Sequence, residues 1–235
     1  MKQTAVVFAI VALVGCGGGS PSSPTPPVTP PPPAPVNRAP TLTSMNFAPT
    51  FGMAGMTTFS FNAAATDLDG DSLSFTWSVA GNPITGTGGT IIFAASNTGG
   101  IPSASVTVTD GKGGSATDRR SFVIGSMTGS WLITSGPLTG STFELTQTDT
   151  GLTTGSFTLP GLGTGNTDPA QPGRITEAGA LTMRIKIGRF TDFNMNGNMS
   201  TSTGRSVSGS LQGSGFTGQP FTMEATGQPV TFVAQ

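Results

Sequence analysis

The chain contains no histidine, no tyrosine and a single cysteine, Cys16, among its 235 residues. These absences exclude Ser-His-Asp and Cys-His catalytic arrangements, histidine-ligated zinc, and zinc or redox sites built from paired cysteines. Charged residues are also scarce, at 9 %, and the formal net charge is −1. A surface for nucleic acid needs clustered lysine and arginine, and the nearest approach to a cluster is Arg119-Arg120. The composition therefore predicts no nucleic-acid partner.

Turn-forming residues are abundant, with 35 glycines and 19 prolines. Beyond the first fifteen residues, no window shows the apolar stripe of an amphipathic helix. Short segments instead alternate apolar and polar residues, which is typical of half-buried strands separated by turns. We therefore expect an all-β protein.

The amino terminus carries one basic residue, Lys2, and then an apolar run from Ala5 to Val14. The run is too short for a bilayer core of about 30 Å, which needs about 20 residues, so it predicts a signal peptide over residues 1–15. Its end, Leu13-Val14-Gly15-Cys16, resembles the lipobox of bacterial lipoproteins. The resemblance implies acylation of Cys16 and cleavage before it; the alternative is an ordinary secretory signal with a chance cysteine.

Lipidation would have two consequences for the mature protein. Several acyl chains give stable membrane anchoring, because each buried CH₂ contributes about 0.8 kcal/mol. The acylated thiol is also the only one, so no disulfide can form. Gly17 follows the cysteine where an aspartate would indicate inner-membrane retention. By the sorting pattern of bacterial lipoproteins, this implies the outer membrane or the cell surface.

Residues 16–40 are predicted to form a linker. Ten of the prolines lie between Pro21 and Pro40. Such a composition cannot bury a core and favours extended polyproline II, at about 3.1 Å per residue.

Residues 41–125 are predicted to form an immunoglobulin-like β-sandwich. In the segment 72–79, Leu73, Phe75, Trp77 and Val79 share one face, with serines and threonines opposite. Similar alternation marks the other expected strands, at 58–66, 90–96, 103–110 and 119–125. Six or seven strands in about 85 residues suit a sandwich of two sheets.

Three motifs of this region come in the order found in a known class of domains. They are Asn-Arg-Ala-Pro at 37–40, DLDGDSLSFTW at 67–77 and SVTVTDGKGGSATD at 105–118. Together they resemble the bacterial PKD and cadherin-like immunoglobulin-type domains, which serve as spacers and binding modules. The resemblance implies a Ca²⁺ site at one pole of the sandwich, with Asn37, Asp67, Asp69 and Asp110 as candidate ligands.

The chemistry of the aspartate motif leaves two interpretations open. Ca²⁺ takes six to eight oxygen ligands, and Asp67 and Asp69 would face the same side of an extended chain. An EF-hand is excluded, because the twelfth position counted from Asp67 is Ser78 rather than glutamate. The alternative is a polar turn in which the aspartates cap their own backbone and Gly70 supplies a positive φ. Asp71 is assigned to that turn.

Residues 126–235 are predicted to form a small antiparallel up-and-down β-barrel. Phe193, Met195, Gly197 and Met199 alternate with asparagines, and the segments 181–187 and 221–225 repeat the pattern. Seven or eight such strands would close into a barrel without exposed edges. Gly129-Ser130-Trp131 resembles the Gly-x-Trp of lipocalin- and avidin-like barrels, and we interpret its tryptophan as a core plug. Only residues 126–128 separate the two β domains, which predicts restricted hinge motion.

Three functions fit these features. The first is a non-catalytic surface lipoprotein acting as a stalk, adhesion or binding module for an unknown protein or glycan partner. The second is a carrier, with an apolar ligand held among four methionines that otherwise only fill the core, Met183, Met195, Met199 and Met223. The third is a glycan-active enzyme. We predict no enzyme, because Glu144 and Glu224 alternate with apolar residues and should point to solvent, without acid–base partners.

Overall fold

The computed structural model describes residues 31–84, 86, 88–188 and 191–227. The predicted signal peptide, Cys16 and the linker up to Pro30 lie outside the described residues. The chain divides into two compact units, residues 1–36 and 37–235. Residues 31–36 are exposed and have no regular secondary structure. None of the described residues belongs to a helix that is long and apolar enough to cross a membrane.

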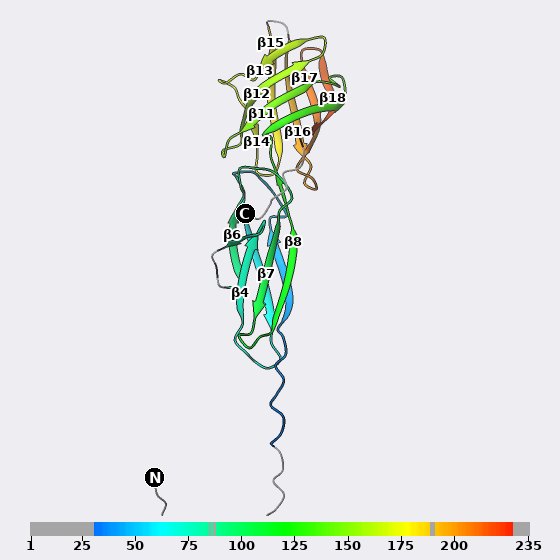
Figure 1. Cartoon of the computed structure of the whole chain (residues 1–235). Coiled ribbons are helices and arrows are strands. Elements are labelled where there is room, and N and C mark those ends of the chain that lie inside the picture. Colours follow the sequence, from blue (N-terminus) through cyan, green and yellow to red (C-terminus); the bar gives the residue numbers. More distant parts are fainter. Residues whose placement is uncertain (1–30, 85, 87, 189–190, 228–235) are drawn as a thin grey trace, which may run out of the picture. The chain divides into compact units, whose positions relative to one another are not determined.

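The first half of the second unit is a sandwich of two antiparallel sheets (Figure 1). One sheet has the order β1 (Thr41–Ala48), β3 (Thr58–Thr66), β6 (Thr90–Ala94). The other has the order β5 (Asn82–Ile84), β4 (Ser74–Val79), β7 (Ser103–Thr109), β8 (Ser115–Ser121). A short parallel pair, β2 (Phe51–Met53) with β9 (Val123–Gly125), completes this part of the chain.

Aromatic rings fill the space between the two sheets. The ring of Phe122 lies 4.7 Å from that of Phe59 and 5.2 Å from that of Phe61, and Phe61 in turn contacts Trp77. The sequence predicted one continuous strand over 119–125, and this prediction was wrong. The chain there forms β8 up to Ser121 and β9 from Val123, because Phe122 between them turns into the core, where it is 1 % exposed.

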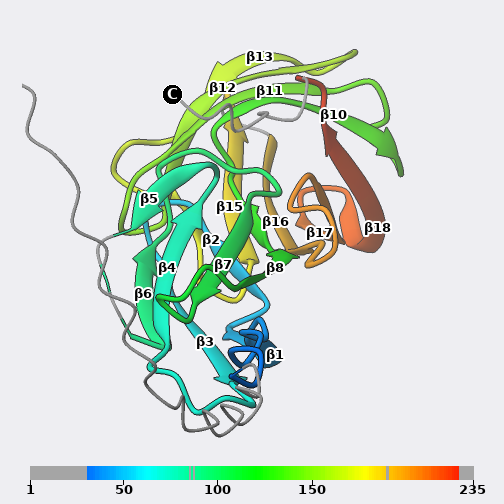
Figure 2. The same cartoon turned by 60° about the horizontal axis from the view of Figure 1, so that its bottom comes forward.

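The second half is a closed antiparallel barrel. Its wall consists of eight strands in chain order: β10 (Gly129–Ser135), β11 (Thr142–Gln147), β12 (Leu152–Leu159), β14 (Gly173–Ile175), β15 (Ala180–Ile187), β16 (Thr191–Met199), β17 (Ser206–Gly213) and β18 (Phe216–Ala225). Each pairs with its neighbour, and β18 pairs back with β10. Figure 2 shows β15 to β18 following one another around this wall. The predicted all-β class, a sandwich followed by an up-and-down barrel, is confirmed.

Along one side of β12, the barrel wall consists of two short strands instead of one continuous strand. β12 pairs with β14 near its start and with β13 (Gly163–Asn166) near its end. Thr167 joins the two pieces to β12: its N–H donates to the carbonyl of Gly155 at 2.8 Å, and its hydroxyl accepts from the Gly155 N–H at 2.8 Å. The buried Thr167 thereby continues the hydrogen bonding between β13 and β14.

Alternation along the strands places the apolar side chains inside the barrel. On β16, Phe193, Met195 and Met199 are buried, whereas Asn194, Asn196 and Asn198 are exposed. The residues predicted to face inward on β15 and β18 are buried or half-buried in the same way. Period-2 alternation therefore identified the inner face of these strands correctly.

The sandwich and the barrel share part of their packing. Phe51 and Met53 of β2 belong to the apolar cluster of the barrel, and so does Met127 in the short connection. Met53 and Met127 are fully buried. The sequence assigned Phe51 and Met53 to the sandwich alone, because only tertiary packing reveals that they cover an end of the neighbouring barrel.

Candidate functional site

The four predicted calcium ligands lie at one pole of the sandwich. Asp67 and Asp69 follow the end of β3, and Asp110 follows the end of β7. Asn37 precedes β1, whose first residue Thr41 is paired with Thr66 at the end of β3. The ends of three elements therefore bring residues distant in sequence to the same pole.

Asp110 is held by three hydrogen-bond donors around a buried side chain that is 3 % exposed. Its Oδ2 accepts from the side-chain amide of Asn37 at 2.8 Å, and its Oδ1 accepts from the N–H of Lys112 and of Gly114. The hydrogen bond from Asn37 is the main cause that lowers the pKa of Asp110, while burial opposes it. A Cβ at Gly114 would lie 2.2 Å from Asp110 Oδ2, so only glycine fits beside this carboxylate.

Asp67 and Asp69 form a turn that is tied to Arg38. Asp67 Oδ1 accepts from the N–H groups of Asp69 and Asp71, at 2.8 and 3.2 Å, and Gly70 adopts a φ of 79°. Asp69 Oδ2 accepts from the Arg38 N–H at 2.7 Å, and its Oδ1 lies 3.5 Å from the Arg38 guanidinium. These are the contacts of an aspartate-capped turn.

The donor set fits a calcium ion only in part. Each of the three carboxylates already accepts N–H groups, and Arg38 places a cation against Asp69. Within the described residues no group of three or more acidic, histidine or cysteine side chains is arranged to hold a metal. One observation points the other way: Asp67 Oδ2 is buried and has no hydrogen-bond partner among the described residues. A buried carboxylate oxygen without a partner is costly, and a cation would relieve it.

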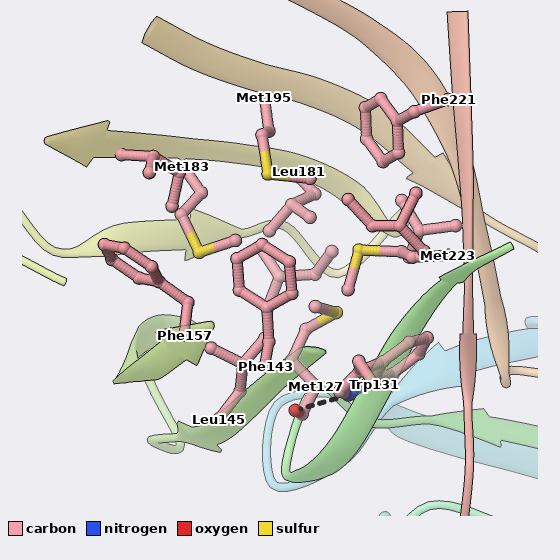
Figure 3. Packing of buried hydrophobic residues seen from close by; sticks show 14 of the residues in the cluster. Met127, Trp131, Phe143, Leu145, Phe157, Leu181, Met183, Met195, Phe221 and Met223 are labelled. Atoms are coloured by element: carbon pink, nitrogen blue, oxygen red, sulfur yellow. Dashed lines mark hydrogen bonds between the residues drawn. The ribbon is translucent and has the colours of Figure 1, made fainter. Parts of the chain in front are cut away.

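The barrel interior is the second candidate site. The four methionines considered as cavity lining are at most 3 % exposed and belong to one apolar cluster. Figure 3 shows three of them, Met183, Met195 and Met223, among aromatic and aliphatic side chains. The indole N–H of Trp131 donates to the Met127 carbonyl at 2.9 Å, so its polar atom is satisfied inside the protein. These contacts agree with the interpretation of the methionines and Trp131 as core.

The two glutamates considered for catalysis lie on the outer wall. Glu144 and Glu224 are both exposed, as alternation predicted. They belong to β11 and β18, on opposite sides of β10, where they pair with Ser130 and Leu132. Glu144 accepts a hydrogen bond of 2.7 Å from the Ser130 hydroxyl. This arrangement provides no enclosed pair of carboxylates for acid–base chemistry.

Gln147 was not recognised from the sequence. Its side chain contacts both the connection and the sandwich, through the Met127 N–H and the Ala54 carbonyl. A glutamine between two threonines at the end of a strand carries no pattern that would indicate this role. All three residues of β2, Phe-Gly-Met, are buried at the junction, which the folded structure shows and the sequence does not.

Comparison with known proteins supports the fold of the sandwich. Residues 37–123 match the family model described as Bacterial Ig domain. Such a domain indicates a protein that is surface-exposed or extracellular. No curated protein matches the chain.

A solved structure with some likeness is described as "Structural basis for the promiscuous specificity of the carbohydrate-binding modules from the beta-sandwich super family". The sequence identity is 16 % and the TM-score 0.36, over 75 % of this chain. The match spans 61 % of the length of that structure's chain. A likeness this low carries no functional argument.

Proposed function

We propose that the protein is a non-catalytic cell-surface lipoprotein whose sandwich and barrel form a stalk and a binding or adhesion module. The observation that carries this proposal is the packing of the barrel. The side chains that would line a ligand cavity instead form one buried apolar cluster. A partner therefore binds to the outer surface of the module.

The position of the module follows from its amino terminus. Acylation of Cys16 anchors the chain in the outer membrane, and the proline-rich residues 16–40 hold the folded unit away from it. The motifs around Asp67 and Asp110 support a domain of the PKD and cadherin-like type, which acts as a spacer in many surface proteins. The Gly-x-Trp motif that ends at Trp131 supports a barrel with the architecture of lipocalins and avidin. In this proposal the barrel acts as a rigid body rather than as a container for a ligand.

The junction supports the role of a stalk. Phe51 and Met53 pack into the barrel cluster, and Gln147 of the barrel hydrogen bonds to Met127 in the connection and to Ala54 in the sandwich. Hydrogen bonds and apolar burial together resist bending between two domains. A load on the barrel is therefore transmitted to the sandwich without a flexible hinge.

Two measurements test this function. Proteinase K added to intact cells should remove the barrel, whereas protection until the cells are lysed would place the module inside the envelope. Titration of residues 37–235 with an apolar fluorophore should give no saturable binding at one site. Saturable binding that competes with a fatty acid would favour the carrier instead.

We also propose that Ca²⁺ binds at the sandwich pole. Its ligands would be Asp67, whose Oδ2 has no hydrogen-bond partner in the described ranges, together with Asp69, Asp110 and Asn37. The orphaned Asp67 Oδ2 supports this proposal. The ion supplies positive charge to carboxylates from several loops of the pole and thereby ties these loops together. Arg38 already supplies a cation there, so calcium must displace it from Asp69.

A further inference from the structure

The outward face of the second sandwich sheet carries a small polar hollow. It has a volume of about 230 Å³ and is lined by Ser78, Gly81, Ser103, Ser105 and Arg119. Strands β4, β7 and β8 are hydrogen-bonded side by side. Their register aligns Ser78 with Ser105 and Ser105 with Arg119, so the three side chains form one row across the sheet.

Arg119 brings a positive charge to this row that no carboxylate of the described residues neutralises. Its Nε donates to the Ser103 hydroxyl at 2.7 Å, which fixes the plane of the guanidinium. Within the described part of the chain it forms no ion pair. The next residue, Arg120, is different, because it pairs with Asp118 at 3.1 Å. Of these two neighbouring arginines, Arg120 therefore has a carboxylate partner within the described residues and Arg119 has none.

The remaining polar groups of the hollow can also bind a ligand. Ser78 and Ser105 are half-buried, and their hydroxyls have no hydrogen-bond partner among the described residues. Hydroxyls beside a fixed guanidinium can bind the hydroxyls and the acid group of one sugar ring. A volume below the roughly 300–1,000 Å³ of drug-sized sites suits a single ring rather than a longer ligand.

A strained turn borders the hollow. Ala80 and Gly81 connect β4 to β5 with φ values of 52° and 83°. Glycine accepts this left-handed region freely, but alanine does not, and strain of this kind persists where the surrounding structure holds it. The Ala80 N–H donates to the Ser103 carbonyl at 2.9 Å, which holds the turn against β7. The turn places Gly81 among the residues that line the hollow.

We propose that this hollow binds a carboxylated sugar, the hexuronic acid unit of an acidic polysaccharide. The guanidinium of Arg119 matches the planar carboxylate, since arginine presents parallel N–H donors to such groups. Ser78 and Ser105 bind hydroxyls of the same ring. One cation suits the single charge of a carboxylate, whereas sites for phosphate and acidic motifs generally gather several arginines. The inference rests on the proposed function, because it names the partner of a surface binding module.

Affinity electrophoresis of the whole folded unit tests the proposal. Polygalacturonate in the gel should retard the wild type, and neutral dextran should not. Arg119→Ala should weaken the binding at least tenfold, and Arg119→Lys should weaken it less. The matched variant Arg120→Ala removes the same charge one residue away and should leave binding within twofold. Ser105→Val should also weaken binding, since it removes a hydroxyl without changing the charge.

Other outcomes would overturn the proposal. Equal losses for Arg119→Ala and Arg120→Ala would mean that any positive charge suffices, and an unretarded wild type would mean that there is no such site. Stronger, Arg119-dependent retardation by dextran sulfate would assign the hollow to sulfate instead. Thermal melts followed by circular dichroism verify that each variant is folded. The proteinase K experiment on intact cells does not depend on Arg119, so failure of this site is distinguishable from failure of the proposed function.

Discussion

The side-chain amide of Gln147, at the end of β11 in the barrel, donates a 2.9 Å hydrogen bond to the carbonyl of Ala54, 93 residues earlier in the sandwich. The same amide accepts from the N–H of Met127 through its oxygen, also at 2.9 Å. One side chain thus joins the first domain, the connection and the second domain. Its contacts should make the two domains unfold together.

Gln147→Ala should weaken this coupling. It leaves the Met127 N–H and the Ala54 carbonyl without their partner, at a cost of roughly 1–3 kcal/mol in the free energy of unfolding. The chain has two tryptophans, Trp77 in the sandwich and Trp131 in the barrel, so Trp77→Phe and Trp131→Phe give a separate fluorescence probe of each domain. We expect coincident urea transitions before the change and separated ones after it. Thr146→Ala, at an exposed position of the same strand, should keep the transitions coincident.

Met195→Asp should prevent the barrel from folding, because it places an unpaired charge at a fully buried position. Asn196→Asp, one residue further on, should change the free energy of unfolding by less than about 0.5 kcal/mol, since it faces solvent. Circular dichroism melts of the two variants provide the comparison. Equal losses would show that the inner face of β16 is assigned wrongly.

The sequence predicted the faces of β16 and β15 because one side of each strand must be buried and the other hydrated. The same logic fails for β2, β9 and β14, which have three residues each and are too short to show a period. β13, Gly-Thr-Gly-Asn, has no apolar residue to reveal it. The junction was missed for a further reason: the contact of Phe51 with the barrel joins residues far apart in the chain.

At the pole, the four candidate ligands lie close to one another as expected, but the sequence did not predict their hydrogen-bond partners. The aspartates follow β3 and β7, and ends of strands that meet at one pole can be inferred from topology. Whether Asp69 contacts a metal or Arg38 depends on side-chain geometry, and a resemblance to other domains carries no information about it. Arg38 lies inside the motif Asn-Arg-Ala-Pro and was interpreted only as part of it.

The hydrogen bond between Asn37 and Asp110 predicts a dependence of stability on pH. The folded state lowers the pKa of Asp110, so this carboxylate stabilises the fold above its unfolded pKa of about 3.9. That contribution is lost as the pH falls through the lower, folded-state pKa. Asn37→Ala should therefore reduce the Tm at pH 7, and its curve should converge with that of the wild type in strong acid. Calorimetry between pH 7 and 2 checks this, with the exposed Asn46→Ala as the comparison.

Calcium should raise the Tm of residues 37–235 by several degrees if it binds at the pole. For dissociation constants of about 10⁻⁴–10⁻³ M, a few millimolar calcium adds about 1 to 2 kcal/mol to the free energy of unfolding. Magnesium should not replace it, because it demands tight octahedral geometry. Asp67→Ala should abolish the rise, and Arg38→Ala should enlarge it by removing the competing cation. Superimposable melts with calcium and with chelator would mean that the motif is a turn alone.

Cys16→Ala should abolish membrane anchoring, because it removes the only acylation site of the chain. Extraction with Triton X-114 should recover the wild type in the detergent phase. The variant should appear as an uncleaved precursor or as a species in the aqueous phase. A wild type found in the aqueous phase would contradict the lipoprotein assignment.

Phe51 and Met53 belong to a strand of the sandwich, yet they pack in the core of the barrel. A genetic exchange that cut the chain near Gly125 would remove these two side chains and expose the apolar surface they cover. Such a transfer would leave the recipient with an incomplete, aggregation-prone barrel. We therefore expect the sandwich and the barrel to be inherited together. A functional transfer of the barrel to another protein should include the sandwich as well.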